Sequence, residues 1–206
     1  NTDMVWLITA EAIQVFGGYG FCRDYPVERV ARSCKVLSIV EGTNGIQSID
    51  LVMRKILMNP GQHNYRVFKN HVQKTIDEAR SVVDETYLLL LEQAMEKMDQ
   101  IMSFLLDHLN QGRFIHLFAL ATQVQQAMHM LCLAWMHVWS LSITIPRMKD
   151  PGKEAATSEI TQEEVFYWSR TLSSRFYLGT EFPKFFGRAQ GILSGEEALI
   201  QADSTV

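Results

Sequence analysis

Apolar residues recur every three to four positions through nearly the whole chain of 206 residues, the pattern of helices that bury one face. No segment shows the strict apolar–polar alternation that marks a half-buried strand. With only 12 Gly and 5 Pro, the sequence has few positions that break regular elements. The chain is therefore predicted to be all-α, and it is long enough for one large domain or a domain with a smaller companion.

The sequence Asn59-Pro60-Gly61 ends a helical pattern and is predicted to be a domain boundary between residues 1–59 and 62–206. Positive and negative residues balance upstream of it, and the net charge of −4 arises downstream. The downstream helices are longer and indicate an antiparallel helical bundle, with a loop over 148–161. The predicted helices span 4–16, 26–37, 46–57, 63–83, 85–109, 114–143, 161–179 and 183–192, with a last short one from 194.

Charge and cysteine content exclude several classes of protein. A net charge of −4 without a basic cluster argues against binding to nucleic acid or to an anionic membrane surface. Three cysteines at wide spacing, none in a Cys-x-x-Cys motif, indicate reduced thiols, and we expect a cytoplasmic protein. The apolar stretch 127–143 contains two histidines and is predicted to be a buried helix, not a membrane span. The abrupt start at Asn1, without a leader, suggests a piece of a longer chain.

Three motifs follow one another in the first quarter of the chain. They are Gln-x-x-Gly-Gly-x-Gly over 14–20, Arg-Asp-Tyr-Pro-Val-Glu-Arg over 23–29, and Glu-Gly-Thr-Asn-Gly-Ile-Gln over 41–47. In this order they resemble the C-terminal catalytic segment of acyl-CoA dehydrogenases. The strong resemblance covers residues 1–58. The helical residues that follow are similar to the C-terminal helical extension of the larger acyl-CoA dehydrogenases, a branch that includes enzymes resembling 3-methylmercaptopropionyl-CoA dehydrogenase.

The resemblance implies an oxidoreductase that converts an acyl-CoA thioester to the 2,3-enoyl-CoA with FAD as cofactor. Glu41 would be the catalytic base that removes the α proton, while a hydride passes to flavin N5. Such a base needs a carboxylate whose pKa is raised, which burial between flavin and substrate would supply. Gly42 would let the backbone approach the substrate closely, because it has no Cβ. In the family the backbone N–H of the base also polarises the thioester carbonyl.

The resemblance also assigns cofactor contacts and partners. Gln14, Gly17 and Gly18 correspond to positions that touch the FAD of a neighbouring subunit, so a homo-oligomer is expected. A second cofactor-binding stretch corresponds to Thr43, Asn44 and Gly45. Electron-transfer flavoprotein would be the acceptor. Many members have Tyr where this chain has Val40, which leaves the substrate open. The helical domain and the β domain that come first in the family are absent, so we expect the isolated chain to be inactive.

Less specific interpretations remain open beside this one. A second hypothesis is a non-catalytic helical oligomerisation or interaction module that retains the motif by descent. His129 and Cys132 are spaced three apart, as metal ligands can be, but no further ligand stands nearby, and core packing is expected. Glu92 and Glu96 lack a Glu-x-x-His partner and indicate a solvated helix face. No metal site is therefore predicted.

Overall fold

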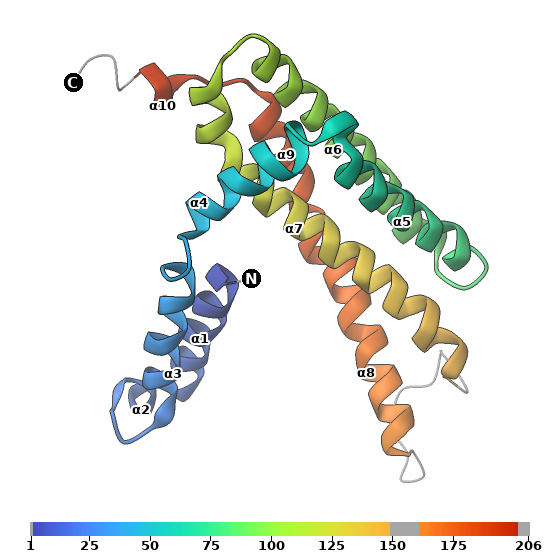
Figure 1. Ribbon diagram of the computed structural model, residues 1–206. Helices are drawn as coiled ribbons and strands as arrows, with labels where there is room; N and C mark the ends of the chain where they lie inside the picture. The colour runs from blue at the N-terminus through green and yellow to red at the C-terminus, as the bar shows by residue number, and fades with distance from the viewer. Residues whose placement is uncertain (1, 149–160, 202–206) are drawn as a thin grey trace. The chain divides into compact units, whose positions relative to one another are not determined.

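The computed structural model describes residues 2–148 and 161–201 and contains only helices and connecting turns in these ranges, which confirms the all-α prediction (Figure 1). The chain forms two compact units, residues 1–50 and 51–206. The predicted loop over 148–161 lies almost entirely outside the described residues.

The first unit is a helical hairpin with a short appended helix. Helix α1 (Thr2–Phe16) packs on α3 (Pro26–Lys35), and the turn between them contains the single-turn helix α2 (Gly18–Phe21). Pro26 occupies the first turn of α3, where its missing N–H leaves no donor unpaired. The 3₁₀ segment η1 (Val36–Ser38) and helix α4 (Asn44–Ile49) complete the unit.

This first unit buries very little apolar surface. Among residues 2–50, four residues are buried, and Ala31 is the one hydrophobic side chain among them; the other three are Thr9, Gly20 and Ser48. Large apolar side chains such as Val15 and Phe21 are 85% and 87% exposed. A patch of this kind normally marks a surface that contacts another protein part.

The second unit is a bundle built on one long helix, α7 (Phe114–Thr144). Helices α5 (His63–Ala79), α6 (Glu85–Asn110), α8 (Gln162–Phe176) and α9 (Lys184–Leu193) all contact α7, as does the short α10 (Ala198–Gln201). Two π-helical segments, η2 (Asp50–Leu57) and η5 (Tyr177–Glu181), and two 3₁₀ turns, η3 (Pro60–Gln62) and η4 (Ile145–Arg147), complete it.

One stripe of α7 forms the centre of this core. Its members are spaced three or four positions apart and are no more than 1% exposed: Leu117, Ala121, Val124, Ala127, Leu131, Ala134, Val138 and Leu141. The segment Phe114–Arg147 is the one helix of the described chain that is long and apolar enough to cross a membrane. Four other long or medium helices pack against its buried stripe, while large apolar side chains elsewhere on the helix, such as Phe118 and Trp139, are exposed.

Most predicted helices are observed, with shifted ends. Helix α5 stops at Ala79, earlier than the predicted 83, and residues 80–83 form a turn into α6, where Asp84 caps the helix by accepting a hydrogen bond from Thr86 N at 2.8 Å. Helix α8 begins with a capping box, which the sequence pattern of Thr161 followed three positions later by Glu164 predicts: the Thr161 hydroxyl accepts from Glu164 N, and Glu164 Oε2 accepts from Thr161 N. The short helix α2 was not predicted.

The compact units divide at Asp50 and Leu51, whereas the sequence predicts a domain boundary at Asn59–Gly61. The difference lies in η2, whose apolar residues Val52, Met53, Ile56 and Leu57 are buried and belong to the second unit. The boundary at Asn59–Gly61 stays a prediction about evolutionary domains, since compactness alone does not define them.

Two adjacent leucines of α6 provide a test of this packing. Leu88 is 1% exposed and Leu89 is 45% exposed. We expect Leu88→Ala to lower the free energy of unfolding by about 2–5 kcal/mol, because it leaves a cavity in the core. Leu89→Ala, with the same helix propensity change, is the matched control and is expected to lower it by less than about 1 kcal/mol. Urea denaturation measures both, and equal losses would contradict the assigned helix face.

Candidate active site

Glu41 has a backbone conformation that is uncommon for a residue with a side chain. Its φ is +56°, in the left-handed region, and the next residue, Gly42, has φ +89°. Only Gln62 among the other described non-glycine residues has a positive φ. A left-handed conformation costs a residue with a Cβ on the order of 1–2 kcal/mol. Such strain is concentrated at functional sites, so the backbone conformation makes Glu41 a candidate functional residue.

The turn is held in place by Gln47. The Gln47 Nε2 donates a hydrogen bond to the carbonyl oxygen of Glu41 at 2.8 Å. Gly42 is favoured by its φ of +89°, and a Cβ there would lie 2.8 Å from the same nitrogen, so a larger residue would displace the Gln47 side chain from this hydrogen bond. Sequence reasoning did not assign a role to Gln47, although it is the last residue of the third motif.

Thr43 and Asn44 fix the helix that follows. The Thr43 hydroxyl caps α4 by accepting from Ile46 N at 3.4 Å. The Thr2 hydroxyl donates to Asn44 Oδ1 at 2.9 Å, which ties the start of α1 to the start of α4. The structure therefore gathers Glu41, Gly42, Thr43, Asn44 and Gly45 into a single turn. The side chain of Glu41 is exposed there.

Gln14, Gly17 and Gly18 lie at the opposite end of the α1–α3 hairpin. Gln14 is in the last turn of α1, and its carbonyl accepts from Gly17 N at 3.0 Å. Thr2, which contacts Asn44, is at the first turn of the same helix. The 15 residues of α1 span about 22 Å at 1.5 Å per residue. The chain therefore does not bring its two predicted cofactor-binding groups together.

Among the glycines of the first and third motifs, Gly18 and Gly45 have no explanation within the chain itself. Gly17 needs its φ of +60°, and a Cβ at Gly20 would lie 2.5 Å from the Ile13 carbonyl oxygen. In contrast, a Cβ at Gly18 would meet nothing within 4 Å, and one at Gly45 would meet only Thr43 Oγ1 at 3.9 Å. Open backbone of this kind fits the close approach of a cofactor, so the residues present are compatible with contacts to FAD.

An aromatic cluster lies beside the glycine turn. The ring of Tyr25 is 6.4 Å from that of Phe16 and 5.2 Å from that of Tyr19, measured between centroids. Sequence reasoning used Tyr25 only as the residue before a helix-starting proline. The Tyr-Pro of the second motif is therefore also a packing element that supports the turn at Gly17 and Gly18.

Three residues considered above as possible metal ligands, His129, Cys132 and Glu92, are partly buried or paired with another side chain. Burial lowers the pKa of His129 and raises the pKa of the Cys132 thiol, so both are neutral residues of the bundle near pH 7. Glu92 is not simply solvated, because Arg80 Nη2 donates to its Oε1 at 2.5 Å. Within residues 2–148 and 161–201, no group of three His, Cys, Asp or Glu residues is arranged to hold a metal ion.

Comparison with known proteins then decides the family. Residues 68–203 match the family model described as "Acetyl-CoA dehydrogenase C-terminal like", and residues 1–57 match the one described as "Acyl-CoA dehydrogenase, C-terminal domain". The chain belongs to the acyl-CoA dehydrogenase family. This family consists of oxidoreductases that use FAD, and the chain corresponds to its C-terminal region.

Individual acyl-CoA dehydrogenases show two levels of similarity. A butyryl-CoA dehydrogenase of Syntrophomonas wolfei is 29% identical over 99% of this chain, and 31% of that enzyme's length is covered. A cyclohexane-1-carbonyl-CoA dehydrogenase of Geobacter metallireducens is 52% identical over 27% of this chain and 14% of its own length. The chain thus spans about a third of the length of the first of these relatives.

The strained turn can be tested without any cofactor. We expect Glu41→Gly to raise the free energy of unfolding of the first unit by about 1 kcal/mol, because glycine adopts φ +56° without strain. Glu41→Gln keeps the Cβ and removes the charge, and should leave stability within about 0.5 kcal/mol. Native-state hydrogen exchange of α1 and α3 reports on this unit. Stabilisation by Glu41→Gln, or destabilisation by Glu41→Gly, would contradict the assigned strain.

Proposed function

We propose that the chain is the C-terminal part of an FAD-dependent acyl-CoA dehydrogenase and that it supplies Glu41 as the catalytic base. The observation that carries the proposal is the strained, Gln47-clamped turn at the position where the family has its Glu-Gly-Thr motif. A carboxylate held on a fixed turn has a defined direction toward substrate, which general-base catalysis requires.

The carboxylate of Glu41 is exposed in this chain, and its role requires burial by substrate and cofactor. Burial away from water disfavours the charged form, so the pKa of Glu41 would rise toward that of a useful base. Abstraction of the proton next to the thioester carbonyl leaves negative charge on the carbonyl oxygen. Among the described residues no group accepts a hydrogen bond from the Glu41 N–H, so that donor is available to the oxygen.

FAD, when bound, would accept the hydride that leaves the neighbouring carbon of the acyl chain. Thr43, Asn44 and Gly45 would contact one cofactor, and Gln14, Gly17 and Gly18 would contact that of a second copy. The length of α1 supports this division, because one hairpin cannot place both groups against the same part of one cofactor. The proposal therefore includes a homo-oligomer.

The remaining assignments follow the family. The product would be the 2,3-enoyl-CoA, with electron-transfer flavoprotein as the acceptor and the cytoplasm as location. Residues 1–59 would be part of the family's helical domain, and residues 62–206 its C-terminal extension. The chain alone would be inactive, because its exposed apolar surface in the first unit lacks the protein parts that bury it.

The exposed surface of the first unit also supports the alternative of a non-catalytic interaction module. The two functions differ in one property, since only the enzyme requires the Glu41 carboxylate. An interaction module would tolerate Glu41→Gln in every assay.

The decisive variant is therefore Glu41→Gln in the assembled enzyme that contains this chain. We expect acyl-CoA oxidation to fall by at least about a hundredfold, because the general base is lost while the shape of the site is kept. Glu11→Gln, which removes an exposed carboxylate of α1, is the matched control and should keep full activity. Flavin absorbance at an unchanged ratio to protein would establish that the variant still binds FAD. Full activity of Glu41→Gln would overturn the proposal.

A further inference from the structure

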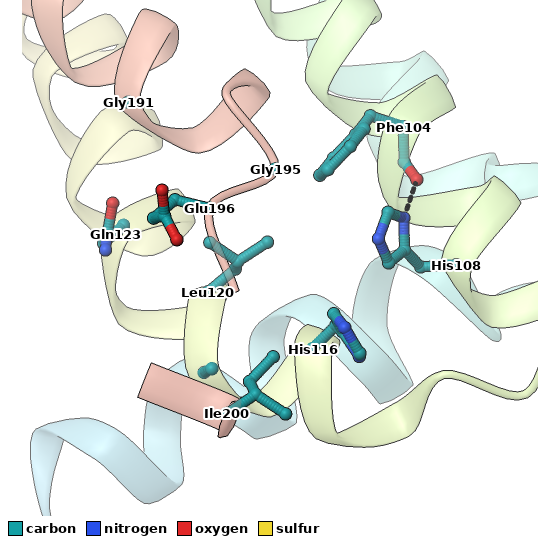
Figure 2. A pocket seen from close by; sticks show the side chains of 10 residues that line it. Phe104, His108, His116, Leu120, Gln123, Gly191, Gly195, Glu196 and Ile200 are labelled. Atoms are coloured by element: carbon teal, nitrogen blue, oxygen red, sulfur yellow. Dashed lines mark hydrogen bonds between the residues drawn. The ribbon is translucent and has the colours of Figure 1, made fainter. Parts of the chain in front are cut away.

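A cavity of about 140 Å³ lies in the second unit, between α6, α7 and the segment that joins α9 to α10 (Figure 2). One polar side chain in its wall, His108, donates through Nδ1 to the carbonyl oxygen of Phe104 at 2.9 Å, a bond within helix α6. In the first unit a side-chain hydrogen bond acts instead on the backbone of the proposed base. Gln47, in helix α4, donates this bond to the carbonyl oxygen of Glu41.

Glu41 lies between two peptide groups that are held by hydrogen bonds. On its N-terminal side, Val40 N donates to the carbonyl oxygen of Val36 at 3.1 Å. On its C-terminal side, its own carbonyl accepts from Gln47 Nε2 at 2.8 Å. Because the backbone is held on both sides, the left-handed conformation of Glu41 is fixed, and so is the direction in which its Cα–Cβ bond leaves the turn.

The donor of this bond is itself on a fixed element. Gln47 N donates to the carbonyl oxygen of Thr43 at 3.0 Å, and the Thr43 hydroxyl caps the same helix. The Thr2 hydroxyl joins the first residue of α4, Asn44, to the first turn of α1 at 2.9 Å. The amide of Gln47 therefore connects the turn at Glu41 to a helix that is tied to the α1–α3 hairpin.

The turn depends on this bond because its conformation is unfavourable by itself. A hydrogen bond contributes about as much to stability as the left-handed conformation of one residue with a Cβ costs. Gly42, the next residue, has no Cβ and offers little resistance to a change of its own φ. Without the Gln47 amide, Glu41 is free to return to a right-handed or extended conformation, which points its carboxylate elsewhere.

We propose that Gln47 is a positioning residue for the base, which acts through the Glu41 carbonyl and sets the direction of the Glu41 carboxylate. The inference rests on the proposed function of Glu41. A misplacement of about 1 Å at a reacting group can cost on the order of a hundredfold in rate. Gln47 therefore controls the rate of proton removal and not the affinity for acyl-CoA.

The first test uses Gln47→Met in the assembled enzyme, because Met is also long and unbranched but donates no hydrogen bond. In single turnover, flavin reduction by acyl-CoA should slow by about tenfold or more, while the Kd of acyl-CoA changes by less than about threefold. Rates are expressed per bound flavin, so a loss of folded enzyme or of FAD does not imitate the effect. Gln190→Met, at an exposed position of α9, is the matched control and should keep the unchanged rate.

The second test needs no cofactor and uses the chain of 206 residues. Glu41→Gly should slow amide hydrogen exchange in α1 and α3 by about fivefold, because it removes the strain. In a Gln47→Met background the same change should slow exchange by less than about twofold, because Glu41 has already left the left-handed region. An equal gain in both backgrounds would overturn the proposal.

The outcomes separate this inference from the proposed function. If Gln47→Met reduces its flavin at the unchanged rate while Glu41→Gln is inactive, the role of Gln47 is overturned and that of Glu41 stands. A weaker Kd with an unchanged rate would also overturn it, because Gln47 would then serve binding. Full activity of Glu41→Gln would overturn the proposed function and this inference together.

Discussion

The second unit depends on the apolar stripe of α7, around which its other helices are arranged. The stripe alternates large residues such as Leu117 and Leu131 with Ala121, Ala127 and Ala134, all with no exposed surface. Small residues let neighbouring helices approach closely, and large ones fill the spaces between them. Because α5, α6, α8 and α9 each contact this helix, its packing determines how these four helices are arranged in the bundle.

In the first unit the constraint is the length of one helix. The α1–α3 hairpin has the Glu41 turn at one end and the Gly17–Gly18 turn at the other. Both turns have residues that the chain alone does not explain: a strained glutamate at one and an open glycine at the other. Together they support a site that is completed by a second copy, with each chain contributing one end to each cofactor.

The sequence predicted what depends on local pattern and motif. The all-α class, the capping box at Thr161 and the family were all within its reach, because periodicity, turn chemistry and motif order are local properties. The sequence did not predict the hydrogen bond from Gln47 to the Glu41 carbonyl. It also did not predict the contacts of Glu197 with Arg113 and His116, because these residues are more than eighty positions apart. The roles of Glu41 and the glycines remain predictions, because a turn does not reveal what binds to it.

Complementation between two inactive variants tests the shared site most directly. Glu41→Gln and Gly18→Val, each expected to be inactive in the assembled enzyme, are mixed, dissociated and reassembled. If each site takes Glu41 from one chain and Gly18 from another, a mixed dimer contains one intact site, and activity returns to about a quarter of the unchanged enzyme's value. If both residues serve the same site within one chain, every site stays defective and the mixture remains inactive, which would contradict the account.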